Sequence, residues 1–324
     1  MASAGGFGQA CPALGEPAVT VLVATSVVRG SRQGESHGGV YLVDLEHKRL
    51  RQTIDWNTTD IDWQGRGWDR GLRGIEFDGE RVYIAASDEL FVYDPEFRCL
   101  GSYRSPYLKH CHEICRYGRR LYLTSTGFDT LLAFDLDEHV FSWGLFVTSE
   151  GEALHATAFD PQSDRGPAPG NELHLNSVKA IERGLYFSGL RTHGLLKFDG
   201  RAVYRTASLP AGVHNAQPFR DGVLFNDSQA DAVRFVTPAS EKAFPVPKYR
   251  VELLTHLELG DPRIARQAFA RGLCVIDEQR IAAGSSPSTI SVHDLESGKT
   301  TEAVTLSRDV RNAIHGLEVW PFGA

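Results

Sequence analysis

The sequence lacks the features that would place the chain in a membrane or outside the cell. No apolar run approaches the roughly 18 residues that a membrane-spanning helix needs. The first residues have neither the basic start nor the apolar core of a secretory signal. The five cysteines are an odd set without disulfide-framework spacing, which favours a reducing compartment. We therefore expect a cytoplasmic protein with no membrane partner.

The chain also lacks a cluster of basic residues and a long amphipathic helix. Its net charge is -7, so we do not expect it to bind nucleic acid. Residues 1–17 are rich in Gly, Ala and Pro and predict a flexible N-terminal arm. Beyond them, apolar and polar residues alternate in short runs bounded by Gly, Asp and Asn, which is typical of strands. All-β chains of this length often form one domain, and we predict one over 18–324.

Six copies of one pattern follow one another along the chain. Each contains a strand-like run that ends in small residues, and these runs are 21–26, 82–87, 121–126, 185–189, 223–228 and 281–286. Shortly after each comes an apolar run that usually ends in Asp, as at 91–94. Six repeats of about four short strands each predict a six-bladed β-propeller.

The two ends of the chain complement each other in this pattern. Residues 315–319 align with 73–77, the first strand of the second copy, whereas the first copy has no such strand before Val19. We therefore predict that the C-terminal strand closes the first blade, which removes exposed sheet edges.

One position of each copy is predicted to face the central channel. In ring order from the first blade, this position holds His315, Arg73, His112, Asn176, His214 and Gly272. Histidine thus occupies alternate blades, about 120° apart around the axis of a six-bladed ring. Three neutral imidazoles with an open position form a common catalytic metal site. We predict one divalent transition metal on His112, His214 and His315; the alternative is that they bind water, or a ligand without metal.

Further polar residues lie near this ring. His110 and His174 each precede a ring position by two residues and share its strand face. Each is a candidate fourth ligand or proton shuttle, or else a loop histidine at the channel mouth. Asn176 is a candidate to ligate or orient a substrate, and Arg73 to hold a carboxylate or phosphate or to pair with a glutamate. Asp227 replaces a small residue of the other copies and is a candidate base or ligand.

Long connections precede the inner strands of the blades without a ring histidine. They lie near 53–70, 142–173 and 240–266. We expect them to rise over the channel mouth, with 160–171 as a flexible lid tip. The first carries Trp56, Trp63 and Trp68, which are candidate walls of a substrate pocket and also suited to pin the loop.

The other cysteines and histidines are given structural roles. Cys111 and Cys115 flank His112 but point away from it on a regular strand, so we predict buried thiols rather than ligands. The histidines interpreted as surface residues are His37, His47, His139, His193, His256 and His293.

Three short pieces carry a resemblance to a known superfamily. Residues 174–178, 185–188 and 315–319 resemble six-bladed propellers of the gluconolactonase/strictosidine-synthase-like superfamily, and also poorly characterised bacterial propellers with His-x-Asn strand starts. The resemblance covers most of the chain as architecture and implies a channel site of the kind that metal-dependent lactone hydrolases build from Glu, Asn and Asp. Here Asn176 matches in kind, and histidines stand in place of the acids. Nitrogen ligands suit Fe, Cu, Zn or Ni better than Ca or Mg.

The sequence therefore favours a metal-dependent enzyme that acts on a small polar molecule. The metal, expected to be Fe, Zn or Cu, would serve a hydrolase or lyase as a Lewis acid, or an oxidoreductase by activating O₂. The alternative is a non-catalytic propeller that binds a ligand or a protein. The pattern leaves the oligomeric state open.

Overall fold

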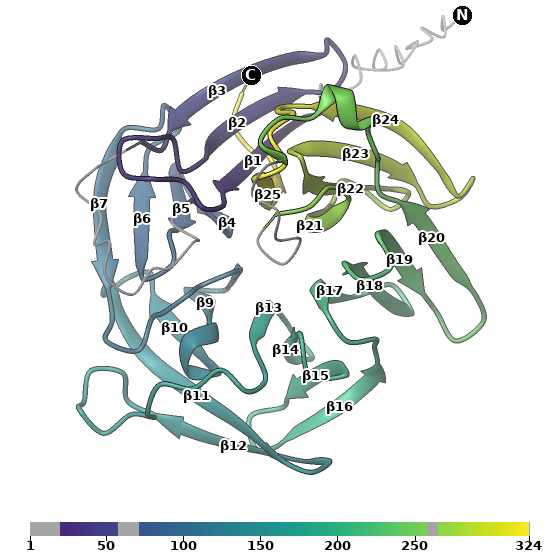
Figure 1. Cartoon of the computed structure of the whole chain (residues 1–324). Helices are drawn as coiled ribbons and strands as arrows, with labels where there is room; N and C mark the ends of the chain where they lie inside the picture. The colour runs from purple at the N-terminus through teal and green to yellow at the C-terminus, as the bar shows by residue number, and fades with distance from the viewer. Residues whose placement is uncertain (1–19, 58–70, 258–264, 324) are drawn as a thin grey trace, which may run out of the picture.

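The computed structural model describes residues 20–57, 71–257 and 265–323. Six antiparallel sheets stand around a common axis, with one strand of each sheet nearest the axis (Figure 1). The all-β, six-bladed propeller predicted from the repeats is thereby confirmed. The N-terminal arm predicted over 1–17 lies outside the described residues.

The strands of each sheet run in order from the axis outward. Blade 1 contains β25 (Asn312–Val319), β1 (Val21–Val28), β2 (Gly39–Asp44) and β3 (Arg49–Asp55). Blade 2 contains β4 (Ile75–Asp78), β5 (Arg81–Ala85), β6 (Glu89–Tyr93) and β7 (Cys99–Arg104). Blade 3 contains β8 (Ile114–Tyr117), β9 (Arg120–Ser125), β10 (Thr130–Asp135), β11 (Val140–Glu150) and β12 (Ala153–Phe159).

The second half of the ring repeats the four-stranded plan. Blade 4 contains β13 (Leu175–Ile181), β14 (Gly184–Gly189), β15 (Gly194–Phe198) and β16 (Val203–Ser208). Blade 5 contains β17 (Val213–Phe219), β18 (Gly222–Asp227), β19 (Ala232–Val236) and β20 (Glu241–Pro245). Blade 6 contains β21 (Phe269–Val275), β22 (Arg280–Ser286), β23 (Thr289–Asp294) and β24 (Lys299–Thr305).

Helical structure in the described residues is limited to two short 3-10 turns, η1 (Thr126–Phe128) and η2 (Val251–Leu253). In this part of the chain, no helix has the length and apolar character that crossing a lipid bilayer takes.

The hydrophobic core is divided into layers between neighbouring blades. The second strand of a blade contributes to two layers at once: in β1, Val21 and Val23 pack toward blade 2, whereas Leu22 and Ala24 pack toward blade 6. All four residues are buried. Because both faces of these strands are covered, their sequences read as continuous apolar runs rather than as strict alternation. Each buried aliphatic side chain stabilises the ring by about 1.5–3 kcal/mol.

The chain closes the ring as the sequence predicts. Strand β25 pairs with β1 in antiparallel register, from Leu22 opposite Val319 to Val28 opposite Asn312. Trp320 extends the pairing by donating its backbone N–H to the carbonyl of Val21 at 2.8 Å. The C-terminal strand is therefore the inner strand of blade 1, and both termini of the domain belong to one sheet.

The long connections are built differently from the loops expected over the axis. Residues 142–159 belong to β11, β12 and the turn between them, and these are the outermost strands of blade 3. The segment that follows is held at Tyr107, whose hydroxyl donates to the carbonyl of Ser163 at 3.0 Å and accepts from the N–H of Gly166 at 2.7 Å. The third connection begins later than expected, because β20 occupies 241–245. Residues 58–70 of the first connection and 258–264 of the third lie outside the described residues.

Candidate functional site at the axis

The residues predicted to form the ring lie on the inner strands or just before them. His315, Asn176 and His214 belong to β25, β13 and β17, while Arg73 and His112 precede β4 and β8 by two residues. All five are buried, with no residue more than 8% exposed. The rings of His112 and His315, from blades 3 and 1, are 6.0 Å apart between centroids. The fold thus brings these side chains together at one end of the axis.

The pairing of three inner strands is irregular at the residues that face the axis. The register between β13 and β14 shifts around Asn176, and that between β17 and β18 shifts just after His214. A shift between β21 and β22 also spans Arg271 and Gly272. Gly272 has φ 76°, a left-handed conformation, and a side chain there would meet Ile314. Bulges of this kind redirect side chains, and here the blade 6 position is filled by Arg271.

Matching hydroxyl groups fix the orientation of two imidazoles. Nδ1 of His112 lies 2.9 Å from Oγ1 of Thr126, and Nδ1 of His214 lies 2.8 Å from Oγ of Ser228. Each hydroxyl donates its own proton to a carbonyl of the next blade, at Leu175 and Ala270 respectively. The oxygens must therefore accept from the imidazoles, so Nδ1 carries the proton in both rings. The Nε2 lone pair is left for another partner.

His174 and His110 differ in how they join this group. The ring of His174 is 5.4 Å from that of His112 between centroids. Its Nδ1 lies 2.9 Å from Oδ1 of Asn171, an acceptor, so His174 has the same tautomer as His112. His110 supports His112 through its backbone, since its carbonyl accepts from Nδ1 of His112 at 2.8 Å. His174 therefore joins the imidazole group, whereas His110 contributes a main-chain contact.

Two of the predicted ring residues carry a buried acceptor that has no hydrogen-bond donor among the described residues. These acceptors are Nε2 of His214 and Oδ1 of Asn176. The amide nitrogen of Asn176 donates to the carbonyl of Val213 at 2.9 Å, which fixes its orientation. Buried acceptors normally have a partner, because leaving one unmet costs about 1–3 kcal/mol. We call His112, His174, Asn176 and His214, from blades 3 to 5, the acceptor half of the site.

Arginines occupy the other side of the axis. Nη1 of Arg271 donates to Nε2 of His315 at 2.7 Å, and Nη1 of Arg73 donates to the carbonyl of Cys111 at 3.2 Å. Arg29, which follows β1, lies over the ring of Phe269, 4.9 Å from its centroid. All three arginines are buried. We call Arg29, Arg73, Arg271 and His315, from blades 6, 1 and 2, the arginine half.

Burial and positive charge keep the imidazoles neutral. Burial lowers the pKa of His112, His214 and His315 well below the usual value, and nearby arginines lower it further. The same causes lower the pKa of His174 to about 3. Arg271 acts on all four rings. Near neutral pH these side chains are therefore lone-pair donors of the kind that metals and hydrogen-bond donors need.

The arrangement fits a metal ion in part. The lone pairs at Nε2 of His112 and His214 suit a transition metal. At His315 the corresponding lone pair accepts from Arg271. As the side chains lie, no three His, Cys, Asp or Glu residues within 20–57, 71–257 and 265–323 are placed to share one metal ion. Coordination therefore requires side-chain rotation or the amide oxygen of Asn176.

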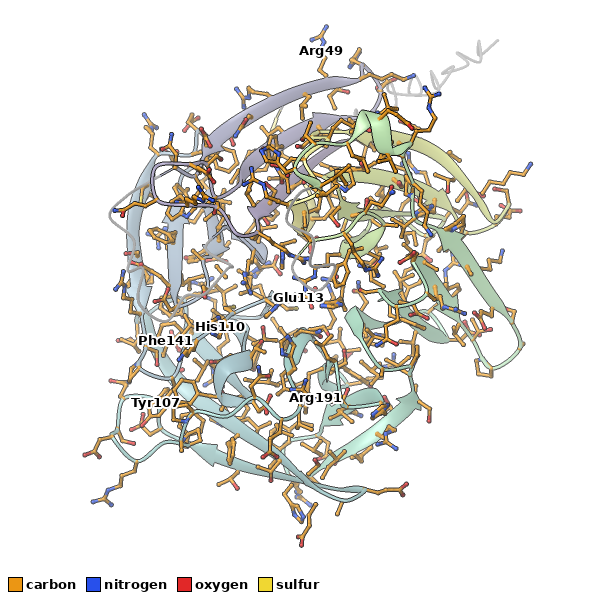
Figure 2. All side chains as sticks on the ribbon, in the orientation of Figure 1. Arg49, Tyr107, His110, Glu113, Phe141 and Arg191 are labelled. Atoms are coloured by element: carbon orange, nitrogen blue, oxygen red, sulfur yellow. The ribbon has the colours of Figure 1, made fainter. Side chains whose placement is uncertain are left out.

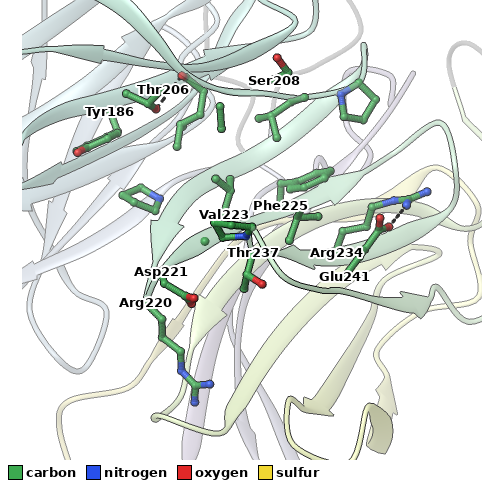
Figure 3. A pocket seen from close by; sticks show the side chains of 18 of the residues that line it. Tyr186, Thr206, Ser208, Arg220, Asp221, Val223, Phe225, Arg234, Thr237 and Glu241 are labelled. Atoms are coloured by element: carbon green, nitrogen blue, oxygen red, sulfur yellow. Dashed lines mark hydrogen bonds and ion pairs between the residues drawn. The ribbon is translucent and has the colours of Figure 1, made fainter.

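Asp227 lies apart from this group. Its carboxylate pairs with Arg234 at 2.9 Å and accepts from the N–H of Ala230 at 3.0 Å. Together with Arg234 it lines a cavity of about 740 Å³ between blades 4 and 5, where Arg234 also contacts Glu241 (Figure 3). The structure thus places this candidate base in an ion pair between two blades.

The tryptophan loop is described only at its start. Trp56 is buried between blades 1 and 2, with its ring 5.1 Å from that of Phe91 in an edge-on contact. Its carbonyl accepts from the N–H of His37 at 2.7 Å. Trp56 thus pins the loop to the blades. Trp63 and Trp68 lie outside the described residues.

A group of carboxylates adjoins the histidines along the axis. Glu113 lies near the centre of the ring, whereas Arg49 lies at its edge (Figure 2). The carboxylate of Glu113 joins two other blades, since it accepts from Nδ2 of Asn215 at 3.0 Å and from the N–H of Val178 at 3.1 Å. Burial raises the pKa of Glu113 to about 7 and that of Glu318 to about 8.

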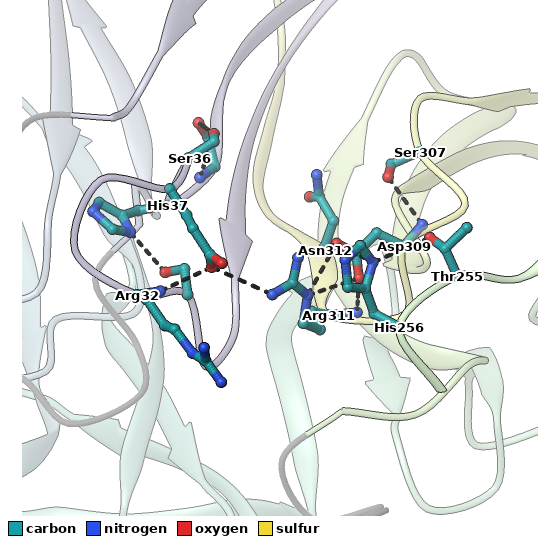
Figure 4. Close-up of polar contacts among 12 residues, drawn as sticks. Arg32, Ser36, His37, Thr255, His256, Ser307, Asp309, Arg311 and Asn312 are labelled. Atoms are coloured by element: carbon teal, nitrogen blue, oxygen red, sulfur yellow. Dashed lines mark hydrogen bonds and ion pairs between the residues drawn. The ribbon is translucent and has the colours of Figure 1, made fainter. Parts of the chain in front are cut away.

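Polar contacts also tie the rim of blade 1 to neighbouring segments. Arg311 pairs with Asp309 at 2.8 Å and reaches Glu35 at 3.5 Å (Figure 4). His256 lies 3.1 Å from the same aspartate. These contacts hold the loop after β1 and the chain around η2 against the start of β25.

Two of the histidines interpreted as surface residues are buried. His37 contacts the hydroxyl of Ser31 through Nδ1 at 2.6 Å, and His293 stacks on Phe244 with centroids 4.6 Å apart. The interpretation was wrong for both, because the turn before β2 folds inward and β23 is covered on both faces. Cys111 and Cys115 are buried, as predicted.

Comparison with known proteins identifies the fold only. No family model and no curated protein matches the chain. A chain of a nidogen/laminin complex is similar with a TM-score of 0.56 and 11% identity, over 93% of this chain and 98% of that one. A protein of unknown function from Bacteroides caccae is similar with a TM-score of 0.57 and 8% identity, over 94% and 100% of the two chains. At such identities the likeness concerns architecture, and function has to be argued from the site.

Proposed function

We propose that the chain is a metal-dependent enzyme that acts on a small polar molecule at the axial site. Among the observations, the matched pairs His112–Thr126 and His214–Ser228 carry the proposal. Holding a histidine by Nδ1–H so that Nε2 can coordinate is the usual arrangement around protein-bound metals. The acceptor of Asn176 that lacks a described donor lies between these two positions in the ring.

His112 and His214 are the proposed core ligands, and the third position has two candidates. His315 completes the triangle expected from the sequence, but its Nε2 must first part from Arg271. His174 already has the tautomer needed and lies beside His112. Asn176 offers an amide oxygen as a further ligand or as an acceptor for the substrate. All-nitrogen or nitrogen-rich ligation favours Fe, Zn or Cu.

Such a metal supplies Lewis-acid or O₂-activating chemistry, so the proposal covers a hydrolase, a lyase and an oxidoreductase. The chain's own residues have separate tasks. Arg73 and Asn176 border the ring between the imidazoles and are proposed to orient the substrate. His110 holds His112 in place through its carbonyl rather than through its side chain.

A second candidate function is a propeller that binds a small ligand without catalysing a reaction. The hydrogen bond from Arg271 to His315 favours it, because it occupies one expected metal ligand. In this alternative, a donor group of the ligand rather than a metal meets the acceptors of Asn176 and His214.

The test is the metal content of the purified protein after equilibration with Fe, Zn or Cu salts. We expect about one ion per chain, and an affinity at least about 10-fold lower in His112→Ala and His214→Ala. His155→Ala, at an exposed position of β12, serves as the control. Comparing His174→Ala with His315→Ala identifies the third ligand. Wild-type protein without bound metal would contradict the proposal, whereas metal retained in both core variants would contradict only the choice of ligands.

A further inference from the structure

One carboxylate near the axis links three blades next to the two core histidines (Figure 2). Glu113 directly follows His112 in blade 3. Its Oε1 accepts from Nδ2 of Asn215 in blade 5 at 3.0 Å, and its Oε2 accepts from the N–H of Val178 in blade 4 at 3.1 Å. Asn215 directly follows His214. We call the hydrogen-bonded pair Glu113 and Asn215 the inter-blade clamp, and each core histidine is one peptide bond away from a member of it.

The amide of Asn215 is held in one orientation. Its Oδ1 accepts from Nδ2 of Asn226 at 2.9 Å and from the N–H of Gly272 at 3.0 Å. Both contacts require an acceptor, so the NH₂ group of Asn215 faces Glu113. The backbone of Asn215 has φ 53°, a left-handed conformation that asparagine and aspartate adopt more readily than most residues. The donor and the acceptor of the clamp are therefore assigned.

The clamp connects blades that the hydroxyl groups at the imidazoles do not bring together. Thr126 links His112 to Leu175 of blade 4. Ser228 links His214 to blade 6. The clamp instead joins blade 3 to blade 5 through side chains 102 positions apart in the sequence. Metal–ligand distances have to fit within about 0.2 Å, so two ligands from non-neighbouring blades need a fixed separation.

We propose that Glu113 and Asn215 are positioning residues, which hold the backbones of His112 and His214 at the separation that a shared metal ion requires. The proposal rests on the function proposed above and explains how ligands from two non-neighbouring blades meet one ion. The clamp contacts neither metal nor substrate and acts through the backbone beside each imidazole. Partners of this kind fix the orientation of ligands in protein metal sites.

Exchanging donor and acceptor breaks the clamp in two ways and then restores it. Glu113→Gln turns an NH₂ group against the donor of Asn215 or that of Val178. Asn215→Asp brings two carboxylates together, at a backbone conformation that aspartate tolerates. In the double variant the new amide donates to the new carboxylate, while the N–H groups of Val178 and Gly272 and the amide of Asn226 keep an acceptor.

Copper(II) is the probe, because nitrogen ligands bind it at least as tightly as other divalent first-row metals. Affinity is measured by competition with a chelator, and electron paramagnetic resonance reports the ligand geometry. We expect Glu113→Gln and Asn215→Asp each to lower the affinity about 10- to 100-fold and to change the spectrum. The double variant should recover the wild-type spectrum and most of the affinity. A purely stabilising contact would lower the melting temperature of the single variants and leave the spectrum unchanged.

Two further variants complete the experiment. Glu76→Gln is the matched control, because Glu76 also accepts from a neighbouring blade, at the N–H of Arg116 at 2.8 Å, but belongs to a blade without a ring histidine. We expect wild-type affinity and spectrum for it. Asn215→Gly removes the amide at a φ that glycine adopts freely, and it replaces Asn215→Asp if that variant does not fold. We expect the same loss of affinity from it.

The outcomes separate this proposal from the one on which it rests. Wild-type protein that binds no copper would contradict the proposed metal site and the positioning role together. Wild-type protein that binds copper, with unchanged affinity and spectrum in Glu113→Gln and in the Asn215 variant that folds, would overturn the positioning role alone. A double variant that folds but does not recover the wild-type spectrum would overturn it as well.

Discussion

The acceptor half and the arginine half share one backbone plan but present opposite kinds of polar atom. In blades 3 to 5, imidazole and amide groups offer lone pairs, two of which have no described donor. In blades 6, 1 and 2, the polar groups are guanidinium donors, and the one histidine there accepts from Arg271. The blades share one backbone plan, but their side chains place hydrogen-bond acceptors on one side of the axis and hydrogen-bond donors on the other.

Histidine has a different hydrogen-bonding role in each half. His112 and His315 are both buried and neutral, and their rings lie near each other. His112 is held from behind through Nδ1, whereas His315 is engaged through Nε2. Both residues are buried histidines, so the difference lies in which ring nitrogen is hydrogen-bonded. The Nε2 atom of His112 is positioned to coordinate a metal, whereas that of His315 must first lose its hydrogen bond from Arg271.

The largest effect on stability is expected from pH. For His112 and His315, burial places the folded pKa well below the unfolded value of about 6.5. Below that pH the unfolded chain binds more protons than the folded chain. As the pH falls, each imidazole therefore lowers the free energy of unfolding by up to about 1.4 kcal/mol per pH unit. We expect His112→Gln and His315→Gln each to reduce this slope by up to one proton between about pH 6.5 and 5, as measured by urea denaturation.

The slope of each variant has to be compared with that of the wild type, because Glu113 and Glu318 change the free energy of unfolding with pH in the opposite direction. Burial raises their pKa values, so the stability they contribute declines as pH rises from about 4.5 toward 7 and 8. His155→Gln, a substitution at an exposed position of β12, is measured in parallel as the control. An unchanged slope in both buried variants would show that the two halves do not hold neutral imidazoles.

A smaller effect is expected from the hydroxyl groups behind the acceptor half. Thr126→Val and Ser228→Ala each remove the acceptor of an Nδ1–H, at a cost of roughly 1 kcal/mol in unfolding free energy. Loss of such a contact should also weaken metal binding about 10-fold. Ser26 occupies the same position in blade 1, where its hydroxyl accepts from the N–H of Gly39, so Ser26→Ala is the control from the other half. Equal metal affinity in all three variants would remove the distinction between the halves.

Regular features of the repeat were predictable from sequence, and local irregularities were not. The strand runs, the closure by β25 and the position of His112 and His214 on or just before the inner strands follow from a pattern of fixed period. Arg271 was missed because the inner strand is irregular at Gly272, where alternation of faces no longer applies. The sequence signal beside it was Gly272 itself, a residue type that tolerates the positive φ found there. Arg29 was missed because it follows β1 and reaches the site from outside the repeat position.

The position of a bound metal ion shows whether the axial histidines are its ligands. Anomalous diffraction from crystals grown with the metal that binds tightest gives that position without relying on activity. We expect one peak, bounded by the Nε2 atoms of His112 and His214. A peak at Glu113 or Glu318, or no peak in crystals of metal-replete protein, would contradict this expectation.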